Sequence, residues 1–186
     1  PLTKSMRSKT SVNYFDRYAL QQRLFEDWLP PEPCQICIVL PAYNEPDILR
    51  AVRSICSCDA PSAPVVLLIV INESVDENQE VLDQNLLTHR QLESFQQLPD
   101  WLILKYAQVT FPSKKSGVGL ARKTGMDSAA YWFHQMQKNG VIACFDADST
   151  CSKNFLIEVE SHFKETHSAS VCFYEHPINT QSGIIP

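Results

Sequence analysis

Short apolar runs alternate along this chain with longer segments of helical spacing, and this alternation limits the folds open to it. Strands are predicted at residues 36–40, 65–71, 101–106, 141–145 and 170–174. Helices are predicted between them, at residues 46–55, 76–95, 117–138 and 154–164. Because strands this apolar are buried on both faces, the pattern predicts an α/β fold with a mainly parallel sheet and helices on both of its faces.

The stretch "NYFDRYALQQRLFEDWLPPEP" precedes this alternation and places aromatic and leucine side chains on one face of a helix, which prolines then end. We therefore predict an N-terminal amphipathic helix and linker at residues 1–33 and a main domain at residues 34–186. Packing of this helix against the main domain is favoured over a partner-binding role, because an apolar helical face usually packs against the protein's own core.

Length and charge narrow the functions open to the chain. Its 186 residues suit one domain or a fragment of a larger enzyme, and because it begins at Pro1 we expect an excised piece. The net charge of -5 gives no reason to expect nucleic acid as a partner. No apolar run approaches the ~18 residues of a membrane span, and no signal peptide is visible. If the protein associates with a membrane, we expect it to do so through regions outside this chain.

The seven cysteines raise the question of a metal or a redox role. Cys34 and Cys37 have the spacing of half a zinc ribbon, but the second half is missing, since "CSC" has the wrong gap. Cys37 lies within a predicted strand, where a small apolar core residue is expected. An odd number of cysteines, most of them in apolar runs, favours reduced thiols and a cytoplasmic location.

Three predicted strands end in unusually polar sequences. The first is followed by "PAYNEPD", the second by "NESVDEN" and the fourth by "DADST". Each alone could be a solvated loop. Because the carboxyl ends of parallel strands meet at one edge of a sheet, the three together predict a binding site at that edge.

The stretch "SKKSGVGLARKTG" lies between the third and fourth predicted strands. Its glycines match a dinucleotide-binding fingerprint only weakly, because Arg122 takes the third glycine position and a polar loop separates the motif from its strand. Lys114, Lys115 and Arg122 suit an anionic ligand better, with glycines that let the backbone approach it. A solvated basic loop is the alternative.

Asp146 and Asp148 follow the fourth predicted strand. In an extended segment their side chains would point the same way, so both could address one ion or ligand. Oxygen ligands of this kind favour Mg²⁺ or Mn²⁺ over zinc. A metal held here would leave coordination positions for phosphate oxygens and would neutralise charge on a departing diphosphate.

Four segments resemble, in order, the inverting nucleotide-sugar glycosyltransferases of family 2, which have the Rossmann-like GT-A fold. They are "CIVLPAYNEPDILRAVRSI", "VVLLIVINESVDEN", "SGVGLARKTGMDSA" and "ACFDADSTCSKNFL". The resemblance implies a nucleoside-diphosphate sugar as donor, with a UDP-sugar expected, and a saccharide or lipid acceptor whose hydroxyl receives the sugar with inversion. The sugar and the oligomeric state are not predicted.

The same resemblance implies roles for individual residues. The nucleotide base and ribose would be lined by Pro41, Ala42, Tyr43 and Glu45. Asn72 would stand where the family usually has an aspartate that reads uracil, Arg122 would lie beside the nucleotide with Lys115, and Asp146 would approach the ribose. Asp148 would hold Mn²⁺ or Mg²⁺ on the diphosphate.

Two departures from the family pattern concern which nucleotide base is preferred and which residue is the general base in catalysis. The usual acidic pair and glycine after the second strand are here "NES". The family's general base lies well beyond the DXD segment. Near the end of this chain the only candidates for that base are Glu175 and His176, and neither lies in a recognisable acceptor motif. We therefore expect a domain truncated on its acceptor side, with the base beyond Pro186.

Two alternatives remain open. A nucleotide-sugar-binding or inactive relative would keep the fold and lack the reaction. "FDADST" also resembles the haloacid-dehalogenase phosphatases, in which the first aspartate is a nucleophile and the second an acid/base beside Mg²⁺. That motif normally opens its domain, whereas here it comes fourth and little chain follows it.

Overall fold

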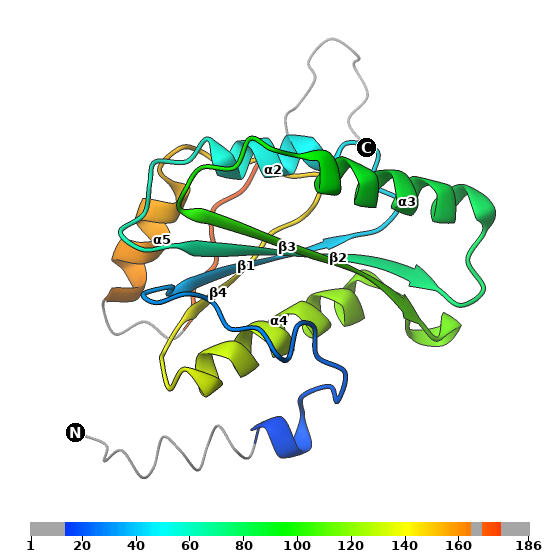
Figure 1. Ribbon diagram of the computed structural model, residues 1–186, viewed down its shortest axis with the longest axis horizontal. Coiled ribbons are helices and arrows are strands. Elements are labelled where there is room, and N and C mark those ends of the chain that lie inside the picture. Colours follow the sequence, from blue (N-terminus) through cyan, green and yellow to red (C-terminus); the bar gives the residue numbers. More distant parts are fainter. Residues whose placement is uncertain (1–13, 165–168, 176–186) are drawn as a thin grey trace.

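The computed structural model describes residues 14–164 and 169–175, apart from the side chain of Lys115. A four-stranded sheet lies at its centre, with the strand order β3-β2-β1-β4 (Figure 1). All neighbouring strands pair in parallel. The strands are β1 (Ile36–Ala42), β2 (Val65–Ser74), β3 (Leu102–Phe111) and β4 (Val141–Cys144). The predicted α/β fold with a parallel sheet is confirmed.

Helices cover both faces of the sheet, as predicted (Figure 1). One face carries α2 (Ile48–Cys56), α3 (Gln79–Ser94) and α5 (Phe155–Lys164). The other carries α4 (Val118–Gln135), which a short 3-10 turn, η1 (Ser113–Lys115), precedes. Alternate residues of β1 enter the two apolar layers, with Leu40 on the α2 side and Val39 on the α4 side. Cys37 is fully buried in the α4 layer, as predicted for a core residue.

Helix α4 lies unusually close to the sheet where Gly125 crosses β1. A Cβ atom placed on Gly125 would come within 2.4 Å of Val39 Cγ1 and 3.3 Å of Val70 Cγ2. Only glycine therefore fits this position without a shift of the Val39 side chain, the helix or the strand. This contact fixes α4, and with it Arg122 one turn earlier, against β1.

The chain changes direction across the sheet at β1. It first moves outward from β1 through β2 to β3, and then crosses back under the sheet through α4 to place β4 on the other side of β1. The carboxyl ends of β1 and β4 therefore meet at a topological switch point, where open α/β sheets bind their ligands. This places the sequences after β1 and β4 at the expected binding edge.

The predicted N-terminal amphipathic helix is largely wrong. Within residues 14–33 only residues 14–17 are helical, and turns and extended chain follow. The predicted packing against the main domain is nevertheless confirmed, because Leu24, Phe25 and Trp28 join the apolar layer on the α4 side.

Hydrogen bonds to polar side chains of α4 explain why the helix at residues 14–17 does not continue. Leu20 N donates to Asp127 Oδ2 at 2.7 Å, and Leu24 N donates to Ser128 Oγ at 2.9 Å. Trp132 Nε1 donates to Phe25 O at 3.3 Å. Backbone groups that a helix would pair internally are here bonded to α4 instead. The domain boundary predicted near residue 33 stays a prediction.

The strand predicted at residues 170–174 is also wrong. Residues 169–175 have no regular secondary structure, and the side chains of Val171 and Phe173 are exposed. β-Rich sequence forms a strand only where a neighbouring strand and an apolar surface receive it. Among the helices that the structure describes, none has the length and apolar character needed to cross a membrane.

Candidate functional site

The sequence after β1 turns at the edge of the sheet. Pro41 and Ala42 are buried at the end of the strand, and Tyr43 is exposed. Asn44 has φ of 49°, in the left-handed region that asparagine tolerates better than most residues. Loss of solvation and a hydrogen bond with Glu77 raise the pKa of Tyr43. The tyrosine therefore lies where the segments after β1 and β2 meet.

Glu45 is held through its backbone. Its carbonyl oxygen accepts hydrogen bonds from Gln84 Nε2 at 2.9 Å and Thr88 Oγ1 at 3.0 Å, both on α3. Its carboxylate accepts from Asp47 N at 2.9 Å. Helix α3 therefore fixes the turn after β1, and the Glu45 side chain stabilises that turn in this conformation.

Asn85 of α3 joins the ends of β1 and β2, and sequence reasoning missed it. Its side chain is buried, with Oδ1 accepting from Asn44 N at 3.0 Å and Nδ2 donating to Asn72 O at 3.1 Å. A signal was present, because Val81, Asn85, Thr88 and Leu92 share one helical face. A polar pair on the buried face of a helix indicates groups that bond something inside the protein.

Asn72 lies inside the sheet, because β2 continues to Ser74, beyond its predicted end at residue 71. The residue is only 1% exposed, and its Nδ2 donates to Ser116 O at 3.1 Å. Its Oδ1 is buried and has no hydrogen-bond partner among the described residues. Buried polar atoms are normally paired, so this acceptor is suited to a donor group from a ligand.

Glu73, the next residue, points to the other face of the sheet and does not join Asn72. Its carboxylate accepts from Gln108 Nε2 at 2.6 Å and Thr110 Oγ1 at 2.9 Å, both on β3. Of the polar residues predicted after the second strand, Asn72 faces the α4 side and Glu73 binds β3.

The basic segment reaches the same edge through α4. Lys114 is exposed in η1, and the side chain of Lys115 is outside the described part of the chain. Gly117 and Gly119, at the start of α4, have open space where a Cβ would lie. The start of α4 therefore leaves room for a ligand to approach the backbone.

An ion pair joins α4 to the end of β4. Arg122 Nη2 lies 2.5 Å from Asp146 Oδ1, and the Asp146 side chain is largely exposed. The Nε of Arg122 is buried and has no hydrogen-bond partner within the described residues. The structure thus brings together Arg122 and Asp146, which the sequence placed in separate motifs.

Asp148 does not lie as expected relative to Asp146. Ser149 N donates to Asp146 O at 3.1 Å, which closes a turn over residues 146–149, so the assumption of an extended segment is wrong. Asp148 is exposed, and its Oδ1 lies 3.5 Å from Ser149 Oγ. Short polar sequences such as "DADST" form turns readily, because aspartate and serine side chains bond nearby backbone.

The donor set fits a metal held jointly with a ligand. No cluster of three or more His, Cys, Asp or Glu side chains suited to a metal exists in residues 14–164 and 169–175. Mg²⁺ is commonly bound through one or two carboxylates plus phosphate oxygens. The exposed carboxylate of Asp148 suits that arrangement. Of the groups considered as a base, Glu175 is exposed, and His176 lies outside the described residues.

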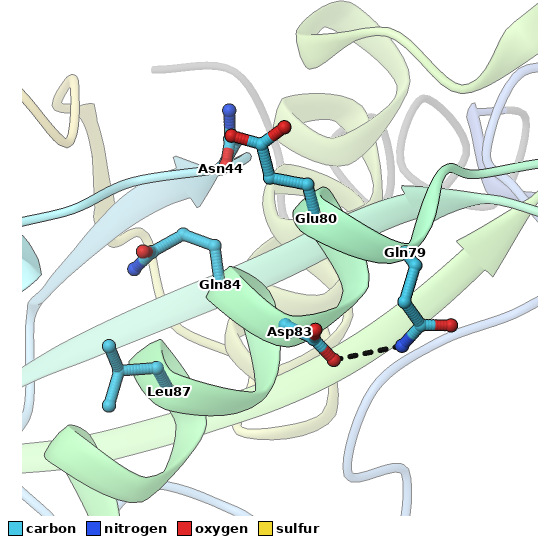
Figure 2. A pocket seen from close by; sticks show the side chains of 6 residues that line it. All are labelled: Asn44, Gln79, Glu80, Asp83, Gln84 and Leu87. Carbon is cyan, nitrogen blue, oxygen red and sulfur yellow. Dashed lines mark hydrogen bonds between the residues drawn. The ribbon is translucent and has the colours of Figure 1, made fainter.

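A separate hollow of about 520 Å³ lies beside α3 (Figure 2). It is lined by Asn44, Gln79, Glu80, Asp83, Gln84 and Leu87. The Gln79 side chain donates from Nε2 to Asp83 Oδ1 at 2.8 Å along the helix. Asn44 belongs to the turn after β1, but none of the residues assigned to the nucleotide or the metal lines this hollow, which therefore competes with the sheet edge as a place for a ligand.

The family model described as Glycosyl transferase family 2 matches residues 37–182. The chain is similar to the crystal structure of S. aureus TarS 1-349, with 20% identity, a TM-score of 0.46, and coverage of 70% of this chain and 32% of that one. For the crystal structure of S. aureus TarS 1-349 in complex with UDP, the identity is 20% and the TM-score is 0.47. The match covers 70% of this chain and 32% of that one. The chain thus spans about a third of the length of these structures. No curated protein matches.

Proposed function

The chain belongs to glycosyl transferase family 2, and from that premise we propose that it binds a nucleoside-diphosphate sugar at the carboxyl edge of its sheet and transfers the sugar to an acceptor hydroxyl. The matched residues 37–182 include the ends of β1, β2 and β4. The haloacid-dehalogenase alternative is rejected, because the family match covers "FDADST" and this motif follows the last strand of the described sheet.

The main support for this proposal is that the ends of three strands, β1, β2 and β4, meet at one edge of the sheet. Asn85 ties the end of β1 to the end of β2, and the Arg122–Asp146 ion pair ties α4 to the end of β4. The switch point between β1 and β4 lies between these two connections. An edge held together from both sides is preorganised for a ligand that touches all three strands.

The nucleoside would lie nearest β1 and β2. Pro41, Ala42, Tyr43 and Glu45 form the turn along which we propose the base and ribose lie. The buried Asn72 Oδ1 would accept a hydrogen bond from an N–H of the base, such as the imide of uracil. A UDP-sugar is therefore the donor we propose. Asp146, exposed beside Arg122, would accept hydrogen bonds from the ribose hydroxyls.

The diphosphate would lie between α4 and Asp148. Lys114, Lys115 and Arg122 would supply positive charge, and the open space at Gly117 and Gly119 would let backbone amides approach the phosphates. Asp148 would hold Mn²⁺ or Mg²⁺ together with the phosphate oxygens. When bound, such a metal neutralises the negative charge that develops on the departing diphosphate.

In the proposed reaction the acceptor hydroxyl attacks the anomeric carbon and the nucleoside diphosphate leaves, with inversion at that carbon. The acceptor is a saccharide or a lipid. We assign no general base to the described residues. Transfer therefore requires a proton acceptor in addition to the groups named here.

A calorimetric titration of the chain with UDP, with and without Mn²⁺, tests the metal assignment. We expect Mn²⁺ to tighten UDP binding by at least about tenfold, or about 1.4 kcal/mol. Asp148→Asn should lose this metal dependence. The matched variant Asp146→Asn should weaken binding but keep its dependence on metal. Unchanged Mn²⁺-dependent affinity in Asp148→Asn would refute the role of Asp148.

Activity distinguishes the transferase from a binding module. The chain is incubated with a UDP-sugar and Mn²⁺, and release of UDP is measured. Release of UDP would exclude a relative that only binds the nucleotide sugar, and binding without turnover would support a domain truncated on its acceptor side. Hydrolysis of p-nitrophenyl phosphate would instead point to a phosphatase.

A further inference from the structure

Two cysteines far apart in the sequence lie in contact on the side of the sheet that carries α2. Cys58, just after the end of α2, and Cys151, in the loop between β4 and α5, have their sulfur atoms 3.6 Å apart. The backbone holds the two segments together, because Asp59 N donates to Lys153 O at 2.8 Å. The contact between the sulfurs is therefore built into the packing of α2 on this loop.

Ser54 of α2 fixes the position of Cys151. Cys151 N donates to Ser54 Oγ at 3.4 Å, and the same hydroxyl lies 3.7 Å from Cys151 Sγ. Cys58 is buried, whereas Cys151 is partly exposed. An oxidant from solvent would therefore meet Cys151 first, with Cys58 directly behind it.

The two thiols differ in acidity. Hydrogen bonding with Cys58 lowers the pKa of Cys151 to about 7, and the Ser54 hydroxyl contributes in the same direction. The same contact, with burial, raises the pKa of Cys58. Because the thiolate is the reactive form of cysteine and Cys151 is the more exposed of the two, we assign Cys151 as the nucleophile of the pair.

We propose that Cys58 and Cys151 form an oxidant-sensitive dithiol, whose substrate is hydrogen peroxide and whose product is an intramolecular disulfide. The Cys151 thiolate attacks peroxide, so that an S–O bond forms, the O–O bond breaks and hydroxide leaves. Cys58 then attacks the sulfenic acid at Cys151. The S–S bond forms, the S–O bond breaks, and the hydroxyl group leaves as water with the Cys58 proton.

The proton that the Cys151 thiol gives up on ionising converts the hydroxide into water. In the net reaction two thiols are therefore oxidised, one peroxide is reduced and two water molecules are formed. The disulfide would join the loop that contains Asp148 to the end of α2. The proposal rests on the contact between the two sulfurs and not on nucleotide binding or sugar transfer, so it can be tested separately from the proposed function.

Peptide mapping of the full chain tests the proposal. The reduced protein is treated with hydrogen peroxide and digested with trypsin without reductant. We expect residues 54–90, which contain Cys56 and Cys58, to be joined to residues 139–153, which contain Cys144 and Cys151. The protein should lose two of its seven free thiols.

Each peptide contains a second cysteine, which supplies a matched control. Cys56→Ser and Cys144→Ser should keep the cross-link, whereas Cys58→Ser and Cys151→Ser should abolish it. In Cys58→Ser the sulfenic acid at Cys151 should persist and be trapped by dimedone.

Three results would overturn the proposal. The first is loss of thiols in the wild-type protein without these peptides becoming joined. The second is a cross-link that survives in Cys58→Ser, and the third is one that disappears in Cys56→Ser or Cys144→Ser. The wild-type mapping decides the first point even if a variant fails to fold.

Discussion

Single polar side chains connect the segments of this site that come from different parts of the chain. Asn85 is the clearest case, since its side-chain amide bonds the backbone of Asn44, in the turn after β1, and the backbone of Asn72, in β2. A residue of this kind contributes to function by setting where other residues lie. It does not itself need to contact the nucleotide.

Asn85→Ala should therefore affect both stability and nucleotide binding. The change leaves Asn44 N–H and Asn72 C=O without their partner, at a cost of about 1–3 kcal/mol for each buried group. Because these groups lie at the ends of β1 and β2, affinity for UDP should fall by about tenfold or more. Thermal unfolding measures the first effect and calorimetric titration the second.

Leu86→Ala, an exposed position on the same helix, is the matched control and should change neither quantity appreciably. If Asn85→Ala lowers the unfolding temperature while UDP binds as to the wild type, Asn85 stabilises the fold alone and does not position the site.

At the scale of elements, α4 connects the N-terminal segment, the sheet and the proposed phosphate site. Its fully buried carboxylate, Asp127, accepts from Tyr14 Oη at 2.6 Å and Leu20 N at 2.7 Å, and pairs with Lys123 Nζ at 2.9 Å. The segment before β1 is therefore attached to α4 by a charged group that has no contact with water.

Asp127→Ala should detach this segment. Asp127 is buried, but its partners Lys123 and Tyr14 are each about 38% exposed, so we expect a cost of about 1.5–3 kcal/mol from the lost hydrogen bonds to the carboxylate. We expect a lower denaturant midpoint and faster proteolytic cleavage within residues 18–28. Met126→Ala, on the exposed side of the same helix, should leave both unchanged. Equal cleavage rates in the two variants would show that Asp127 does not hold the segment.

Gly125→Ala tests the close packing of α4 on β1. The added methyl group would lie 2.4 Å from Val39 Cγ1, so either the Val39 side chain or the helix must shift, and we expect a loss of about 1–3 kcal/mol in unfolding free energy. Gly119→Ala, on the same helix with open space around it, should instead gain up to about 1 kcal/mol. Chemical denaturation measures both, and equal effects would contradict the packing argument.

At the scale of the whole molecule, the sheet and its helices could be predicted because their signal is local. Apolar runs such as residues 65–71 and helical spacing such as that around Val52 depend on neighbours in the sequence alone. The order of the motifs then predicted the edge where Tyr43, Asn72 and Asp146 would gather. That edge follows from the parallel α/β rule and needs no side-chain detail.

Partners that are distant in the sequence caused the error at residues 18–33 and hid the role of Asn85, whereas the error at residues 146–149 is local. The segment 18–33 reads as an amphipathic helix, but Asp127 and Ser128 bind the backbone groups that a helix would use. The helical spacing places Asn85 on the buried face of α3, but the sequence does not say that it bonds the turn after β1 and the backbone of β2. The turn at residues 146–149 depends on one backbone hydrogen bond, which a sequence of small polar residues neither requires nor forbids.

The central claim is that a nucleoside diphosphate binds where β1, β2 and β4 end, and not in the hollow beside α3. Amide chemical shifts measured in ¹⁵N-labelled protein during titration with UDP and Mg²⁺ test it most directly. We predict the largest changes at Tyr43, Asn72, Arg122 and Asp148, with little change at Asp83 and Leu87. Changes confined to Gln79–Leu87, or none at the strand ends under saturating UDP, would contradict the claim.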